Sequence, residues 1–175
     1  HFPLLEISHL GQQNQFSQQI NFVSIDVKQA NLEVLQQIQK IPSAVVILST
    51  SNLHGLAEQR KVFNLLLAEK INLPVILKRS YQGFTFEDFQ LYSSTDFGGL
   101  ILDGQSDGIF ISSDLPLQKI NTTIFGVLQA TRTRISKTEY ISCPSCGRTL
   151  FDLQDTTAMI RSRTAHLKGL KIGIM

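Results

Sequence analysis

The sequence is poor in cysteine, tryptophan and charged residues. Among 175 residues there are two cysteines and no tryptophan, and charged residues make up 17%. Because the cysteines are Cys143 and Cys146 alone, neither has a disulfide framework to join. Any soft-metal or redox chemistry of the chain must therefore use these two side chains.

Strong net charge and long apolar runs are also absent. The formal net charge is +2, and lysine and arginine are spread among the acids, which argues against a nucleic-acid partner. No stretch approaches the ~18 consecutive apolar residues of a membrane span, and the first residues lack the features of a signal peptide. With 42% hydrophobic residues, the chain can bury a core. We expect a cytoplasmic, globular protein without a membrane or nucleic-acid partner.

From residue 20 onward, short apolar runs alternate with helical patterns. The strand-like runs lie at 21–27, 44–50, 75–77, 99–102 and 108–112, and amphipathic or capped segments lie between most of them. One of these segments begins at Thr85, whose hydroxyl suits a helix cap and is followed by two acids. This alternation predicts an α/β fold with a parallel sheet. It is compatible with part of a (β/α) barrel and with an open doubly wound sheet, and the sequence does not decide between them.

The character of the sequence changes near residue 135. A strand is predicted at 139–141, followed by the cysteines, a helix from about Leu153 to Leu167 and a last strand. About 40 residues are marginal for an independent fold without a metal or a partner. The chain also starts without methionine and stops in an apolar, strand-like run. We therefore expect a fragment of a longer polypeptide that ends in a truncated second domain.

The cysteines form a Cys-x-x-Cys step that contains Pro144 and is followed by Gly147. Such a step suits a zinc ion, one edge of an iron–sulfur cluster or a redox dithiol. Proline fixes one φ angle, and glycine can take a positive φ that lets the next amides point at thiolates. The stretch after the step is not helical at once, which disfavours a thioredoxin-type dithiol. Metal or cluster ligation is the first interpretation, and a pair of reduced structural cysteines is the alternative.

Basic residues flank the cysteine step. Arg134 and Lys137 precede it and Arg148 follows it, as suits an anionic cluster or a phosphate-bearing substrate. Cations favoured at a helix C-terminus, followed by a solvated linker, explain the same pattern equally well. His166 is a candidate for a further zinc ligand, although a histidine at a helix end is more often a surface residue.

Two stretches around the step resemble a known family. Residues 137–154, KTEYISCPSCGRTLFDLQ, closely resemble the 4-hydroxy-3-methylbut-2-enyl diphosphate synthases, iron–sulfur enzymes of the non-mevalonate isoprenoid pathway. Residues 160–175, IRSRTAHLKGLKIGIM, strengthen the resemblance, which is specific over 132–175. Weaker features upstream are similar to the long form of the family, which carries an insert domain.

The resemblance implies an α/β architecture in two parts. Residues 1–136 would be part of a (β/α) barrel-like insert domain, and 137–175 the start of a truncated α+β, reductase-like iron–sulfur domain. Cys143 and Cys146 would be two ligands of a 4Fe-4S cluster, with the remaining ligands beyond Met175. No catalytic residue is assignable, and the fragment alone would be inactive and need not hold the cluster.

The resemblance also implies a reaction and partners. The full enzyme would reduce 2-C-methyl-D-erythritol 2,4-cyclodiphosphate to (E)-4-hydroxy-3-methylbut-2-enyl diphosphate, with flavodoxin or ferredoxin as electron donor. A homodimer is one assembly it allows, and the location would be a bacterial cytoplasm or, for a plant-type source, the plastid stroma. The alternative is a zinc-knuckle binding or scaffold module without catalysis, held by Cys143, Cys146 and His166.

Overall fold

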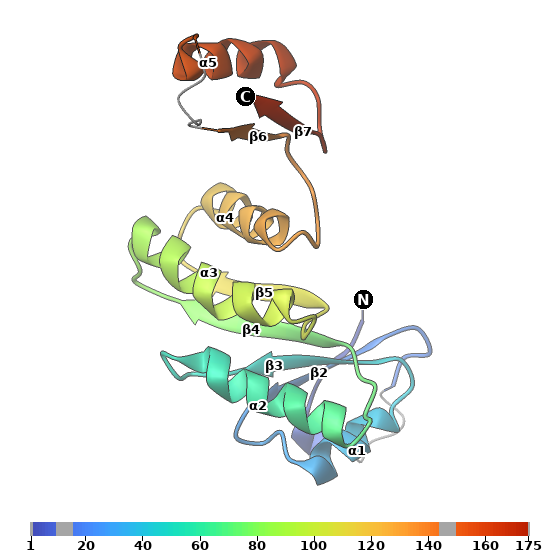
Figure 1. Ribbon diagram of the computed structural model, residues 1–175. Helices are drawn as coiled ribbons and strands as arrows, with labels where there is room; N and C mark the ends of the chain where they lie inside the picture. The colour runs from blue at the N-terminus through green and yellow to red at the C-terminus, as the bar shows by residue number, and fades with distance from the viewer. Residues whose placement is uncertain (1, 10–15, 144–149, 175) are drawn as a thin grey trace. The chain divides into compact units, whose positions relative to one another are not determined.

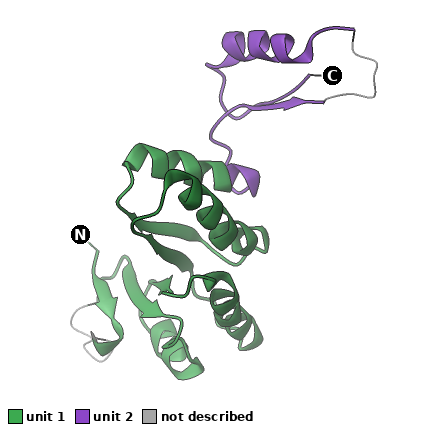
Figure 2. Ribbon diagram, turned by 90° about the vertical axis from the view of Figure 1, so that its left-hand side faces the viewer, with its two compact units in different colours: residues 1–127 green, residues 128–175 purple. Residues whose placement is uncertain are grey.

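A computed structural model describes residues 2–9, 16–143 and 150–174 (Figure 1). It divides the chain into two compact units, unit 1 from His1 to Val127 and unit 2 from Leu128 to Met175 (Figure 2). The domain boundary predicted at 136/137 lies inside unit 2. The identity of the two domains stays a prediction.

Unit 1 is built on a five-stranded parallel sheet with helices between most strands. This confirms the α/β class and the parallel sheet that the alternating pattern predicted. The strands are β1 (Leu4–Glu6), β2 (Asn21–Asp26), β3 (Ala44–Ser49), β4 (Val75–Tyr81) and β5 (Gly108–Ser113). A short 3-10 helix, η1 (Ile7–His9), follows β1, and the α-helices are α1 (Leu32–Gln39), α2 (Gly55–Ala68), α3 (Phe86–Leu102) and α4 (Leu117–Ala130), which extends into unit 2.

The described strands of this sheet are ordered β1-β2-β3-β4-β5, as in the sequence. A doubly wound sheet reverses its strand order at one point, and no such reversal is present in the described sheet. Because crossovers between parallel strands are almost always right-handed, a sequential order places the connecting helices on one face. The described sheet therefore lacks the doubly wound topology, which is one of the two that the sequence left open.

The burial of the strands fits helices on one face. Val23, Val46 and Val75 are paired neighbours and at most 1% exposed, so this row belongs to the core. On the opposite face Leu4 is 62% exposed and Phe110 43% exposed. One face of the sheet therefore carries the core of unit 1, and the other is partly open in the described chain.

The prediction of a strand at 99–102 is wrong, because these residues form the last turn of α3. The hydroxyl of Thr85 caps this helix by accepting a hydrogen bond from the Asp88 amide, as its sequence indicated. Phe97 and Leu100 are fully buried, so the apolar run is the core-facing side of a long helix. A short apolar run does not by itself distinguish a buried strand from a buried helix.

Unit 2 contains a β-α-β arrangement after the end of α4. Its described elements are β6 (Glu139–Ser142), α5 (Leu153–Thr164) and β7 (Lys171–Ile174), and the two strands pair in parallel. The predicted order of strand, helix and strand is thus present, with the helix ending three residues before Leu167. Asp152 caps α5 by accepting from the Asp155 amide. None of the helices described in either unit has the length and apolar character needed to cross a membrane.

Candidate functional site around the first cysteine

Cys143 lies at the end of the β6–β7 ladder. Its amide donates to the Ile174 carbonyl at 3.2 Å, so the ladder fixes the backbone at this cysteine. Its side chain is exposed and forms no disulfide. Cys146 and Arg148 fall within 144–149, outside the described residues, so their predicted roles have no geometry to compare with.

No group of three or more histidine, cysteine, aspartate and glutamate side chains in the described residues could hold a metal. His166 is exposed in the turn that follows α5, and the described structure does not bring it into such a group with Cys143. Cys143 has the accessibility that a thiolate ligand needs. A single thiol cannot complete a ligand set, because clusters of this kind take four ligands as a rule.

Of the predicted basic residues, Arg134 and Lys137 are both described and exposed. Lys137 lines a cavity of about 340 Å³, and Arg134 is not among the residues that line this cavity. The same cavity is lined by Arg161 and Lys168, two cations that the sequence interpretation missed. Arg161 and Lys168 lie far from Lys137 in the sequence, so no local sequence pattern links the three residues. They line one cavity because the chain returns through α5.

A second cavity, of about 290 Å³, lies between the end of β6 and the first turns of α5. Ser142 and Thr157 line it and share a hydrogen bond of 2.9 Å between their hydroxyls. Arg161 lines both cavities. Arg161 is therefore shared by the cavity that Lys137 lines and by the cavity at Ser142, the residue that precedes Cys143.

Unit 1 holds a different polar cluster, which is buried. Arg79 and Asp96 are each 5% exposed and form an ion pair of 2.9 Å between Nε and Oδ2. The Tyr81 hydroxyl donates to the same oxygen at 2.8 Å. Burial, followed by the neighbouring Asp96 charge, raises the pKa of Tyr81 above its ordinary value. Each buried polar group of this cluster thus has a partner, as stability requires.

The guanidinium of Arg79 also holds the loop between β3 and α2. Its Nη1 donates to the carbonyls of Thr50 at 3.1 Å and Asn52 at 2.7 Å, and its Nη2 donates to the carbonyl of Leu53 at 3.2 Å. Gly55 permits this approach, because a Cβ there would lie 2.5 Å from Nη1 of Arg79. The cluster therefore acts as a structural anchor, and no predicted site residue belongs to it.

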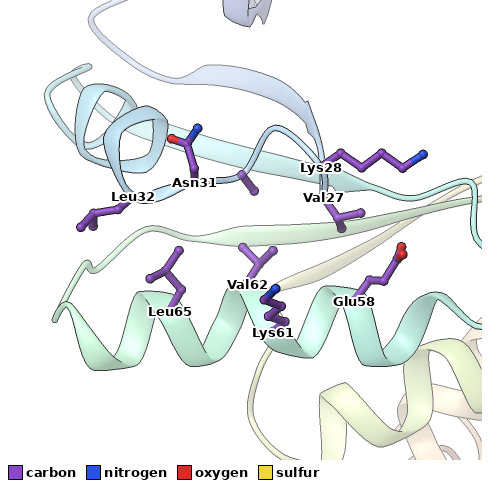
Figure 3. Close-up of a pocket in the computed structure, with 9 residues that line it drawn as sticks. Val27, Lys28, Asn31, Leu32, Glu58, Lys61, Val62 and Leu65 are labelled. Atoms are coloured by element: carbon purple, nitrogen blue, oxygen red, sulfur yellow. The ribbon is translucent and has the colours of Figure 1, made fainter.

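A cavity of about 510 Å³ in unit 1 lies between the β2–α1 connection and α2. Figure 3 shows Glu58, Val62 and Leu65 on α2 facing Val27 and Leu32 across it. The Glu58 carboxylate accepts from Asn52 and Thr50 at the rim. These hydrogen bonds lower the pKa of Glu58, the one with Asn52 having the larger effect. None of the predicted cofactor or substrate residues lines this cavity.

Comparison with known proteins shows relatives of one class, diphosphate synthases. Relatives from three bacteria all carry the name 4-hydroxy-3-methylbut-2-en-1-yl diphosphate synthase (flavodoxin). The protein of Porphyromonas gingivalis is 47% identical over 158 residues, which cover 89% of this chain and 27% of the relative. Those of Parabacteroides distasonis and Bacteroides thetaiotaomicron are 42% and 41% identical over 175 and 176 residues, covering 99% of this chain and 29% of each relative.

The chain is a homologue of these synthases and corresponds to a segment of them. It spans just over a quarter of the length of the curated relatives it matches. The resemblance inferred from 132–175 is thereby confirmed, and the similarity continues through unit 1. No protein-family model matches the chain.

Proposed function

We propose that the chain is part of a 4-hydroxy-3-methylbut-2-enyl diphosphate synthase. The complete protein would reduce 2-C-methyl-D-erythritol 2,4-cyclodiphosphate to (E)-4-hydroxy-3-methylbut-2-enyl diphosphate. The observation that carries this proposal is 42% identity to one such synthase over 99% of the chain. A zinc-knuckle module would account for the cysteines but not for the similarity of both units to the same enzyme, so it is not favoured.

The proposed cofactor is a 4Fe-4S cluster with Cys143 and Cys146 as two of its ligands. Support comes from Cys143, whose thiol is exposed and whose backbone is held by the strand ladder. A bound cluster of this type supplies the electrons of a reduction. The residues of this chain would hold one edge of it, and the remaining ligands are proposed to lie elsewhere in the complete protein. Arg134, Lys137 and Arg148 are proposed neighbours of the cluster or of the substrate.

For the architecture, we propose that 1–136 is part of a (β/α) barrel-like insert domain. The sequential order of five parallel strands supports this, because a (β/α) barrel has the same order. Residues 137–175 would begin a reductase-like iron–sulfur domain, in keeping with the β6-α5-β7 arrangement.

The proposed partners follow from the relatives. Their names include flavodoxin, which supports flavodoxin, or ferredoxin in its place, as the electron donor of the complete protein. The substrate would be a diphosphate-bearing small molecule, and the assembly a homodimer. A bacterial cytoplasm is the proposed location, since the relatives are bacterial proteins.

The cofactor proposal is tested with the full-length protein that contains this chain, reconstituted without air. We expect iron and sulfide in equal amounts, broad absorption near ~400 nm, and loss of both in Cys143→Ala and Cys146→Ala. His166→Ala is the matched control, because the cluster proposal gives this residue no role. Stoichiometric zinc without iron, lost in His166→Ala, would establish the zinc knuckle instead.

A further inference from the structure

The cavity of about 510 Å³ in unit 1 has the size of a small-molecule site, since such sites occupy ~300–1,000 Å³. Its lining comes from the β2–α1 connection, the first residue of α1 and one side of α2. Five of the nine lining residues are apolar: Val27, Ala30, Leu32, Val62 and Leu65. Ala30 and Val62 are buried, and the other three are half-buried. The cavity therefore suits a ligand with an apolar body.

The connection that forms one wall is held by its own hydrogen bonds. The Asp26 side chain accepts from the Lys28 amide at 3.0 Å, and the Asp26 carbonyl accepts from the Gln29 amide at 2.9 Å. The side-chain oxygen of Asn31 caps α1 by accepting from the Val34 amide at 2.9 Å. This bond uses the oxygen of Asn31 and leaves its Nδ2 as a donor at the wall. The wall is thus formed before any ligand arrives, which lowers the entropy cost of binding.

Three charged side chains line the cavity, Lys28, Glu58 and Lys61. Figure 3 shows Lys28 and Glu58 at one end of it. The hydrogen bonds from Asn52 and Thr50 lower the pKa of Glu58, with a smaller contribution from the charge of Lys28, so this end carries a carboxylate. Lys61 takes part in none of the ion pairs of the described chain. The lining therefore has a net charge of +1, and Lys61 is the cation that no carboxylate of the cavity balances.

We propose that this cavity binds a small molecule that carries one carboxylate on an apolar body, with the carboxylate beside Lys61 and the body against Val62 and Leu65. A single negative charge neutralises the lining, whereas several would leave an excess of negative charge beside Glu58. An apolar body covers the walls and removes their surface from water, which favours binding. The proposal goes beyond the proposed function and does not depend on it, because none of the proposed cluster or substrate residues lines this cavity.

The test is a calorimetric titration of the 175-residue chain with octanoate and with three compounds that separate its two parts. Octanol has the same hydrocarbon chain without the charge, acetate has the charge without the chain, and pyrophosphate has several charges and no chain. We expect saturable binding of octanoate at one site, about tenfold weaker binding of octanol, and no measurable binding of acetate in the same concentration range. The proposed ligand class is overturned if octanoate does not saturate, if octanol binds as tightly, or if pyrophosphate binds more tightly.

Two matched pairs of variants locate the site. Lys61→Gln should weaken octanoate binding about tenfold and change octanol binding less than about twofold, because the alcohol has no charge to lose. Lys40→Gln removes the same charge outside the cavity lining, so it should change the affinity for either ligand less than about twofold.

The second pair tests the apolar wall of α2. Leu65→Ser should weaken the binding of octanoate and octanol alike, by about fivefold, because both ligands cover this side chain. Leu67→Ser is its control, since Leu67 is 69% exposed on the same helix and does not line the cavity. Equal losses within either matched pair would overturn the site in favour of diffuse attraction or general partitioning onto the surface.

Discussion

The two compact units differ in what holds them together and in the sign of their charge. Unit 1 has eleven acidic and eight basic residues, whereas unit 2 has three acidic and eight basic residues in 48 positions. Nearly all the fully buried apolar side chains described belong to unit 1, and Ile174 is the buried apolar residue described in unit 2. No described residue of α5 is buried.

This difference shows where ligands would contribute to stability. Unit 1 has an apolar core between its sheet and helices, which is the main source of folding free energy. In unit 2 the strands β6 and β7 pair through their backbones, and α5 is joined to β6 by hydrogen bonds between hydroxyls and by a ring contact. A bound cluster would therefore stabilise unit 2 by mass action, whereas unit 1 has an apolar core of its own.

The largest expected effect comes from the ion pair in unit 1. Arg79→Met should lower the free energy of unfolding by about 3–5 kcal/mol, because it leaves a buried Asp96 charge without its cation. It also removes the donors that hold the loop after β3. Urea denaturation, monitored by amide signals of unit 1, measures the change.

The matched substitution in unit 2 is Arg132→Met. Arg132 and Glu139 are 3.9 Å apart with side chains 57% and 37% exposed, so their pair is screened by solvent. We expect the loss of this pair to lower the free energy of unfolding by less than about 1 kcal/mol. If Arg79→Met and Arg132→Met lowered the free energy of unfolding by similar amounts, the proposed distinction between the buried ion pair of unit 1 and the exposed pair of unit 2 would be wrong.

The same contrast explains what the sequence could predict. Alternating apolar runs and the Thr85 cap identified the parallel sheet and α3, because these signals are local. The strand-like run at 75–77 extends to Tyr81 in β4, since Arg79 is neutralised by an aspartate 17 positions later. Pairing over that separation leaves no local pattern. The meeting of Lys137 with Arg161 was invisible for the same reason, whereas the family resemblance came from local sequence at 137–175.

A smaller effect is expected from glycine substitutions that compare packing in the two units. In unit 1, Gly55→Ala would place a Cβ 2.5 Å from Nη1 of Arg79 and 2.5 Å from Cγ2 of Thr50. We therefore expect this substitution to lower the free energy of unfolding by about 1–3 kcal/mol. In unit 2, a Cβ at Gly173 would meet nothing within 4 Å, and Gly173→Ala should change stability by less than about 0.5 kcal/mol. Thermal unfolding of both variants provides the measurement. A larger loss in Gly173→Ala than in Gly55→Ala would contradict the packing described for unit 1.

The smallest effect concerns the response of unit 1 to acid. Hydrogen bonds from Asn52 and Thr50 favour the charged form of Glu58 and lower its pKa in the folded chain. A group whose folded pKa lies below its unfolded value adds stability above the unfolded pKa, and this contribution is lost as the pH falls through the folded pKa. Glu58→Gln should therefore flatten the decline in unit 1 stability below about pH 4.5, the ordinary value for glutamate, and leave the acid response of unit 2 signals unchanged. If the decline below this pH is equally steep with glutamine, the hydrogen bonds to Glu58 do not couple the loop after β3 to the protonation of the chain.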